Sequence, residues 1–265
     1  MTAHRPSRRL VLLVVAVALV AAACGDDDAP AAATATTAAA PQTTTTPVTA
    51  TLAEVPLEST RPAADYAGFR AQETACGGTR PPASIPLTFE APGDMGLDPG
   101  TMLQATITTS CGDITVSLEP GIAPATVNSF VFLAEQGYFD GTVSHRIVPG
   151  FVLQAGDPTA TGLGNPGYVL PDELPPDDFV YATGVLAMAN AGPGTSGSQF
   201  FIMLSDNPLP PQFSVFGRVL DGDATLDRIA AIPLGSLGRE ASIPLETLYI
   251  ESVTIGTTVA DATYP

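Results

Sequence analysis

Short segments of alternating apolar and polar residues recur between residues 101 and 258, and turn residues separate them. Residues 102–109 alternate in this way, Cys111-Gly112-Asp113 can form a turn, and residues 114–118 resume the alternation. A period of two places successive side chains on opposite faces of a strand, so this unit is predicted to be a β-hairpin. The same reasoning predicts further strands at 142–148, 151–154, 185–189, 199–204, 214–219 and 248–255.

Two segments of the same region have helical spacing instead. Residues 124–136 place large apolar side chains three and four positions apart, and Gly137 then ends the pattern. A second helix is predicted at residues 223–231. Eight short strands with two helices predict a mainly β fold, a closed eight-stranded antiparallel β-barrel capped by two helices. The periodicity alone is also compatible with a β-sandwich.

The first residues are typical of an export signal. Arg5, Arg8 and Arg9 precede an uninterrupted apolar run at 10–20, and three alanines come directly before Cys24. The run is too short for a permanent membrane-spanning helix, so residues 1–23 are predicted to be a signal peptide. A cysteine at this point resembles a bacterial lipobox, which predicts that Cys24 is lipidated and anchors the chain to the extracytoplasmic face of the cell membrane. Ordinary cleavage before an unmodified Cys24 stays open.

Composition divides the remaining chain into three parts. Residues 24–65 are rich in Ala, Thr and Pro and have almost no large apolar side chains. Such a segment cannot bury enough surface to offset its loss of chain entropy, so it is predicted to be a disordered tether. Residues 66–100 form a Pro/Gly-rich extension, and residues 101–258 are predicted to fold as one compact domain.

The charge of the chain limits its partners. The formal net charge is -17, with 10 basic residues against 27 acidic ones, and there is no lysine. Without the three arginines of the signal, seven arginines face 27 acidic residues, a net charge of -20. Such a surface repels phosphate backbones and anionic lipid headgroups, so no nucleic acid partner is expected.

The sequence argues against three common kinds of site: a dinucleotide-binding site, a metal site and a serine hydrolase site. Residues 162–167 match the spacing of a dinucleotide-binding glycine motif, but no strand leads into them and Pro166 stands where the helix should begin. The exported chain has one histidine, His145, and its cysteines lack the spacing of metal ligands. No Gly-x-Ser-x-Gly motif is present for a serine hydrolase. We therefore expect a reaction that needs no nucleophile, metal or cofactor.

Two segments carry the functional signal. Residues 144–157 read Ser-His-Arg-Ile-Val-Pro-Gly-Phe-Val-Leu-Gln-Ala-Gly-Asp, and residues 186–202 read Leu-Ala-Met-Ala-Asn-Ala-Gly-Pro-Gly-Thr-Ser-Gly-Ser-Gln-Phe-Phe-Ile. One arginine, several amides and several aromatic rings suit the binding of an uncharged peptide. Both segments, with the run Phe-Ser-Val-Phe-Gly-Arg-Val at residues 213–219, resemble the signature stretches of the cyclophilins, which are peptidyl-prolyl cis–trans isomerases.

The resemblance implies a cyclophilin-like barrel and a role for each matching residue. Arg146 occupies the position of the catalytic arginine, and Phe151 and Gln154 accompany it. The substrate-binding residues implied by the match are Val152, Ala189, Asn190, Gln199, Phe201, Leu209 and Phe213. His145 alternates to the opposite face from Arg146 and is expected to be structural.

These observations predict a peptidyl-prolyl isomerase that assists the folding of exported proteins. Its partners would be proline-containing polypeptides and, through the lipid anchor, the membrane; the protein is expected to be a monomer. The alternative is a catalytically weak cyclophilin-like module that binds peptides or a partner protein without meaningful turnover.

Two further cysteines are predicted to form a disulfide. Once Cys24 is lipidated, Cys76 and Cys111 remain, and unpaired thiols are uncommon in an oxidising compartment. Cys111 lies in the predicted hairpin turn and Cys76 in the extension. A bond between them would pin residues 66–100 against the barrel, whereas two buried or reduced thiols remain the alternative.

Overall fold

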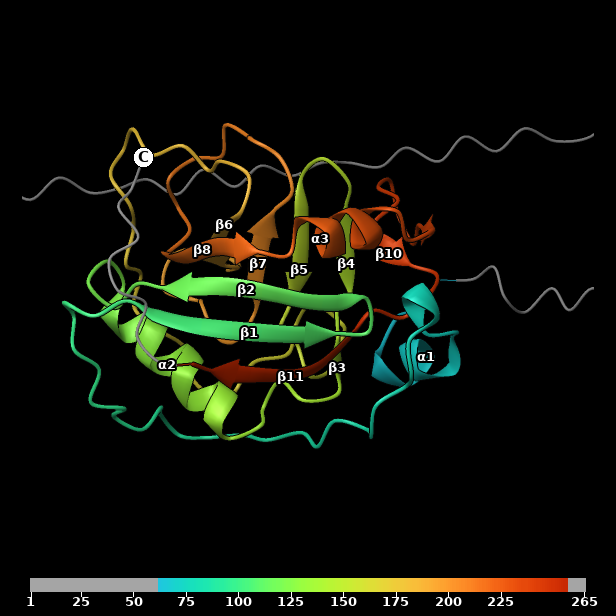
Figure 1. Ribbon diagram of the computed structural model, residues 1–265, viewed down its shortest axis with the longest axis horizontal. Coiled ribbons are helices and arrows are strands. Elements are labelled where there is room, and N and C mark those ends of the chain that lie inside the picture. Colours follow the sequence, from blue (N-terminus) through green and yellow to red (C-terminus); the bar gives the residue numbers. More distant parts are fainter. Residues whose placement is uncertain (1–61, 257–265) are drawn as a thin grey trace, which may run out of the picture. The chain divides into compact units, whose positions relative to one another are not determined.

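Within residues 62–256, the part of the chain that the computed structural model describes, nine antiparallel strands form one strongly curled sheet (Figure 1). The predicted signal peptide, Cys24 and nearly all of the predicted tether lie outside the described residues. The order across the sheet is β3-β11-β1-β2-β8-β6-β7-β5-β4. The bounds are Leu103–Thr109 (β1), Gly112–Leu118 (β2), Thr142–Val143 (β3), Arg146–Val148 (β4), Val152–Ala155 (β5), Val185–Met188 (β6), Phe200–Met203 (β7), Val215–Asp221 (β8) and Tyr249–Ile255 (β11).

The sheet is an open half-barrel, so the prediction of a closed eight-stranded barrel was wrong. The segment at 142–148, predicted as one strand, divides at Ser144 into β3 and β4, which pair with β11 and β5. The Ser144 N–H donates to the Leu248 carbonyl at 3.0 Å and its hydroxyl donates to the Gln154 carbonyl at 2.8 Å. Ser144 therefore bonds toward both edges of the sheet, and the chain passes between the edges without closing the ladder.

The helices of the described region are α1 (Tyr66–Ala71), α2 (Pro124–Glu135) and α3 (Asp223–Ala230), with a short 3-10 helix, η2, at Ala75–Gly77. The predicted helices at 124–136 and 223–231 thus agree with α2 and α3 to within one residue, whereas α1 was not predicted. The strands β9 (Leu234–Gly235) and β10 (Ile243–Pro244) form a separate two-stranded sheet. No helix among residues 62–256 is both long and apolar enough to cross a membrane.

The main core lies between the sheet and α2. The ring of Phe130 on α2 lies 5.1 Å from that of Phe139, 5.6 Å from that of Phe200 on β7 and 5.3 Å from that of Phe216 on β8, measured between centroids. All four rings are at most 3% exposed. Large buried rings contribute much of the apolar burial that stabilises a domain of this size.

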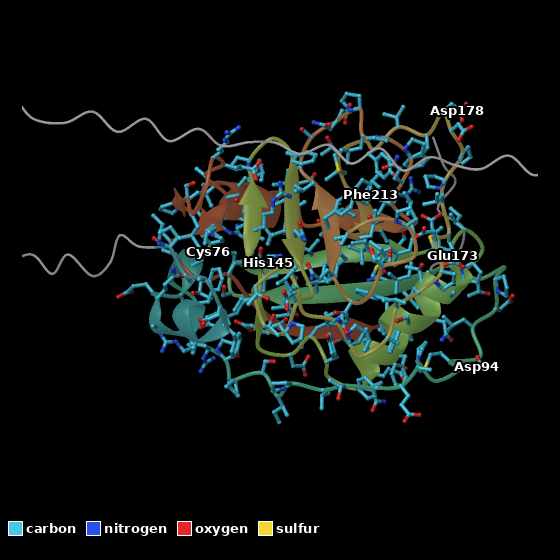
Figure 2. The ribbon with its side chains drawn as sticks, turned by 180° about the vertical axis from the view of Figure 1, so that it is seen from behind. Cys76, Asp94, His145, Glu173, Asp178 and Phe213 are labelled. Atoms are coloured by element: carbon cyan, nitrogen blue, oxygen red, sulfur yellow. A yellow bond between two sulfur atoms is a disulfide. The ribbon has the colours of Figure 1, made fainter. Side chains whose placement is uncertain are left out.

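A residue from a distant loop caps α2. Pro124 occupies the first turn, and Ala123 before it offers no capping side chain. The carboxylate of Glu173 accepts hydrogen bonds from the N–H groups of Ala125 (2.9 Å) and Thr126 (2.8 Å). Figure 2 shows Glu173 beside this end of the helix. A carboxylate there satisfies free N–H groups and favours the helix dipole, so Glu173 ties its loop to α2.

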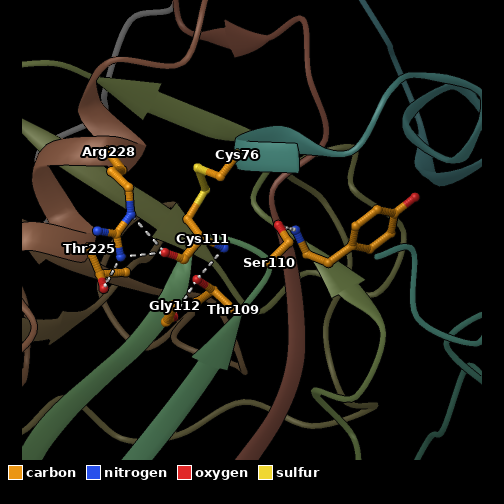
Figure 3. Close-up of a disulfide and its surroundings, with 8 residues drawn as sticks. Cys76, Thr109, Ser110, Cys111, Gly112, Thr225 and Arg228 are labelled. Atoms are coloured by element: carbon orange, nitrogen blue, oxygen red, sulfur yellow. Dashed lines mark hydrogen bonds between the residues drawn. A yellow bond between two sulfur atoms is a disulfide. The ribbon is translucent and has the colours of Figure 1, made fainter. Parts of the chain in front are cut away.

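The extension runs alongside the curled sheet and α2 (Figure 1), and a disulfide attaches it to the β1–β2 turn. Cys76 in η2 forms a disulfide with Cys111 in the β1–β2 turn, with a Cα–Cα distance of 5.2 Å. Arg228 of α3 donates from Nε and Nη2 to the Cys111 carbonyl at 3.0 and 2.6 Å (Figure 3). The bond that the cysteine content favours is therefore present, and α3 supports the same turn.

Candidate active site

The register of three strands places the central site residues in one row. Arg146 on β4 pairs with Gln154 on β5, and Gln154 pairs with Phe201 on β7. Directly paired residues project from the same face of a sheet, so these three side chains are neighbours. Their chain neighbours Ile147, Leu153 and Ile202 point into the main core instead. The functional row thus lies on the face opposite the core.

Nine of the ten predicted catalytic and substrate-binding residues line one cavity of about 280 Å³. They are Arg146, Phe151, Val152, Gln154, Ala189, Asn190, Phe201, Leu209 and Phe213. Gln199 lies in the adjoining cavity of about 300 Å³, which shares Gln154, Ala189 and Asn190 with the first. The structure therefore brings together residues that are up to 67 positions apart in the chain.

The apolar wall of the cavity belongs to a second buried cluster. The rings of Phe201 and Phe213 meet edge to face with centroids 5.4 Å apart. Behind them, the hydroxyl of fully buried Tyr181 donates to the Phe213 carbonyl at 2.9 Å and accepts from the Phe213 N–H at 3.2 Å. Tyr181 thus fixes the backbone that carries Phe213. Sequence reasoning missed Tyr181, because it lies in a proline- and acid-rich stretch without periodicity.

Arg146 is held at the edge of the cavity by three neighbours. Its Nη2 lies 3.0 Å from Oε2 of Glu240, its Nη1 donates to Oε1 of Gln154 at 3.5 Å, and its guanidinium lies 5.7 Å from the centre of the Phe151 ring. The Arg146 side chain is 30% exposed and that of Glu240 49%. An ion pair this exposed contributes little to stability. It does fix where the positive charge lies. Glu240 was not predicted, since no pattern links it to residue 146.

A directed chain of amides continues inward from Arg146. Nε2 of Gln154 donates to Oε1 of Gln199 at 3.0 Å, and Nε2 of Gln199 donates to the Gly164 carbonyl at 3.0 Å. Arginine can only donate, so the oxygen of Gln154 must face it and the orientation of both amides follows. The half-buried glutamines thereby satisfy their polar atoms and stay in fixed positions.

Asn190 has a different contact pattern from the one expected of a peptide anchor. Its Nδ2 donates to the Gln212 carbonyl at 2.8 Å, and its Oδ1 accepts from the Gly192 N–H at 3.2 Å. The side chain therefore holds the segment next to Phe213 and shapes the cavity wall. Its direct contact with a peptide stays a prediction.

His145 lies next to Arg146 in the chain, and its pKa is shifted. Burial lowers the pKa of His145 below the ordinary value of 6.5; Asp157 raises it in part and Arg146 lowers it further. Burial alone would raise the pKa of Asp157, but hydrogen bonds from Thr159 and Gly164 more than offset this and lower it below 3.8. The folded state therefore favours neutral His145 and ionised Asp157, which are the forms that predominate at neutral pH.

We expect acid to destabilise the protein through His145. In the unfolded chain His145 takes up a proton near pH 6.5, whereas in the folded chain burial opposes protonation. The contribution of neutral His145 to the free energy of unfolding is therefore fully present above pH 6.5. It decreases below that pH by at most about 1.4 kcal/mol per pH unit. Asp157 acts in the same direction only below pH 3.8. Thermal unfolding at pH 7 and pH 5 should show a smaller decrease in Tm for His145→Gln than for the wild type. An equal decrease in both proteins would exclude His145 as the cause.

The arrangement offers one cation, a set of oriented amides and a close-packed apolar wall. Within residues 62–256, no three His, Cys, Asp or Glu side chains gather as metal ligands would. A neutral peptide with an apolar ring could occupy the cavity, with a fixed positive charge beside it.

Comparisons with known proteins agree with this geometry. Residues 104–255 match the family model described as "Cyclophilin type peptidyl-prolyl cis-trans isomerase/CLD". The "Probable peptidyl-prolyl cis-trans isomerase B" of Mycobacterium tuberculosis is 40% identical over 187 residues, which cover 65% of this chain and 59% of that protein. The "Peptidyl-prolyl cis-trans isomerase B" of Streptomyces anulatus is 42% identical over 58% of this chain and 97% of its own length. A crystal structure of a Cryptosporidium parvum cyclophilin type isomerase is 32% identical, with a TM-score of 0.55, over 59% of this chain and 98% of that one.

Proposed function

We propose that this chain, which belongs to the cyclophilin-type peptidyl-prolyl cis-trans isomerase family, catalyses the cis–trans isomerisation of Xaa-Pro bonds in exported polypeptides. One observation carries the proposal: nine of the ten catalytic and substrate-binding residues that the family resemblance implies line one cavity. The reaction breaks no covalent bond, so it requires no nucleophile. A fixed cation, oriented amides and an apolar wall, which this site has, are sufficient.

The barrier to isomerisation comes from amide resonance. It is about 20 kcal/mol, so the uncatalysed exchange takes tens of seconds or more. An enzyme needs only to bind the twisted amide more tightly than either planar form. Twisting leaves a lone pair on the prolyl nitrogen, which a hydrogen-bond donor can stabilise.

Arg146 supplies that donor in the proposed mechanism. Its guanidinium stays protonated, and Glu240, Gln154 and the Phe151 ring hold it at the edge of the cavity. A donor fixed before the substrate arrives needs little reorganisation during the reaction. The cavity walls, Val152, Phe201, Leu209 and Phe213, would receive the proline ring. A structure of the Cryptosporidium parvum relative, 33% identical to this chain, was obtained in the presence of the dipeptide Ala-Pro, which supports a proline-containing ligand here.

A protease-coupled isomerisation assay with an Xaa-Pro peptide tests the proposal. Catalysis should appear as an accelerated slow phase that is proportional to the protein concentration. Peptide binding in a calorimetric titration without acceleration would instead support the second candidate, a cyclophilin-like binding module. The fixed position of Arg146 at the cavity edge favours the enzyme, because binding an uncharged peptide does not require a cation.

The task we infer for the enzyme is to assist folding outside the cytoplasm, from the extracytoplasmic face of a membrane. The signal-like residues 1–23, Cys24 directly after three alanines and the disulfide at Cys76 support this location. A lipid on Cys24 would hold the domain near emerging chains through the predicted tether.

We expect Cys24→Ala to give an unacylated protein that leaves the membrane fraction. Detergent partitioning and mass spectrometry of the mature N-terminus measure this directly in the producing bacterium. The isomerase domain should be unaffected, because Cys24 lies far before the family match, which begins at residue 104. Membrane association equal to that of the wild type would contradict lipidation at this residue.

A further inference from the structure

The extension contacts one loop of the candidate site, residues 157–167, near the beginning and near the end of that loop. At one end, the Tyr66 N–H donates to the Thr159 carbonyl at 2.9 Å. At the other end, the Phe89 N–H donates to the Pro166 carbonyl at 2.8 Å. A Cβ atom at Gly167 would lie 2.5 Å from the Phe89 carbonyl oxygen, so the two backbones touch closely there. Residues 62–92 lie before the family match, which begins at residue 104.

The loop between these contacts is folded around one buried carboxylate. Asp157 is fully buried, and Oδ1 accepts from the N–H and the hydroxyl of Thr159, both at 2.7 Å. Its Oδ2 accepts from the N–H groups of Gly162 (2.7 Å) and Gly164 (3.1 Å). Gly164 lies so close that a Cβ atom would collide with Oδ1 of Asp157. The carboxylate thus fixes the backbone of residues 159–164.

The loop also contains a residue in an unfavourable conformation. Ala160 has φ of +57°, which residues with a side chain adopt rarely. Such a conformation persists only where the surroundings hold it. Ala160 is 4% exposed in a cluster with Phe69 of the extension and with Ala63 just before it. The extension therefore supplies part of the packing that maintains the loop.

The loop acts on the site through the Gly164 carbonyl. This carbonyl accepts from Gln199, which accepts from Gln154, which accepts from Arg146. If the loop moved, Gln199 would lose its acceptor and the two amides could rotate. The apolar wall would remain, because β5, β7 and residues 209–213 carry it.

We propose that residues 62–92 are a positioning element of the site, which hold the 157–167 loop so that the Gly164 carbonyl orients Gln199, Gln154 and, through them, Arg146. The proposal rests on the proposed function only where activity is the readout, since the orientation of the amides can be observed directly. Loss of the element should lower kcat and leave KM nearly unchanged, because substrate binding depends mainly on the apolar wall.

Phe69→Ala tests the element with a matched control. Phe69 is 1% exposed in the cluster that holds α1 to the loop, so truncation should release α1. Leu118→Ala removes a fully buried side chain from the main core, at a position on β2 whose strand partners are Leu103 and Gly217 and not residues of the extension or the loop. The measurements are kcat and KM on an Xaa-Pro peptide, below the Tm of both variants, and the side-chain amide NMR signals of Gln154 and Gln199.

Phe69→Ala should lower kcat about tenfold and shift both glutamine signals, since small displacements of a positioned group cost large factors in rate. Leu118→Ala should lower Tm without either change, and Phe69→Leu should restore both readouts. Tyr66→Phe is the milder variant should Phe69→Ala fail to fold. It removes the hydroxyl that donates to the Gly141 carbonyl (2.8 Å) and accepts from the Ser84 N–H (2.7 Å), and should shift the same signals less.

Unmoved glutamine signals in a folded Phe69→Ala or Tyr66→Phe protein would overturn the proposal, as would equal shifts in Leu118→Ala. A wild-type protein without isomerase activity would refute the proposed function instead. The NMR comparison would still decide whether the extension orients the amides.

Discussion

Replacement of Arg146 by alanine is expected to lower kcat/KM for an Xaa-Pro peptide by about 10² to 10³-fold, the usual effect of removing one oriented donor from an active site. Among residues 62–256, Arg146 is the one cation that lines the cavity, so no other side chain of that lining can replace it. Most of the loss should appear in kcat, since the lone pair that Arg146 would stabilise exists only in the twisted state.

The fold should survive this substitution. Arg146 is 30% exposed, and its partner Glu240 is 49% exposed, so Arg146→Ala leaves no buried charge without a partner. Circular dichroism and Tm should therefore match those of the wild type. Arg146→Lys keeps the charge without the planar fork and should show intermediate activity. Glu240→Gln serves as the control, because it removes the ion pair and keeps the guanidinium. A folded Arg146→Ala protein with full activity would disprove the mechanism.

The sequence predicted the site better than it predicted the sheet around it. Arg146, Gln154 and Phe201 could be nominated because they sit within contiguous signature segments, and strand register then placed them in one row. The prediction of a closed barrel was wrong because the strand predicted at 142–148 is divided at Ser144. The hydrogen bonds of Ser144 to Leu248 and Gln154 lead toward the two edges of the sheet. Alternation of apolar residues does not specify which edge a strand joins.

Other parts of the site were invisible in the sequence because they depend on contacts between distant segments. Glu240 reaches Arg146 across 94 positions, and Tyr181 clamps Phe213 across 32, without any pattern that links them. The helix α1 has six residues, too few to be stable alone, and it exists because Phe69 is buried against the domain. Within residues 66–100, all of which the structure describes, the buried side chains are those of Phe69 and Ala75, and both belong to clusters with residues beyond 100.

The second large effect is expected at the Cys76–Cys111 disulfide, which we predict to contribute about 4 kcal/mol to the free energy of unfolding. The bond joins residues 35 positions apart. In the chain-entropy model, closing a loop of about 36 residues restricts the unfolded chain by this amount. A change of 1 kcal/mol shifts Tm by about 2–4 °C in a domain of 150–250 residues, so Cys76→Ser/Cys111→Ser should unfold about 8–16 °C below the wild type.

The surroundings of the two cysteines determine how the test should be made. Cys111 is 5% exposed, and Arg228 holds its carbonyl, so the turn should keep its shape when the bond is absent. Cys76 lies in the extension, where the neighbouring anchors that would remain include the buried side chain of Phe69 and the backbone hydrogen bonds of Thr247 with Glu73 and Ala75. A dithiol reductant should therefore lower the Tm of the wild type to that of the double serine variant and leave the variant unchanged. If the wild type kept its Tm after complete reduction, the bond would contribute nothing to stability, and packing alone would hold the extension on the domain.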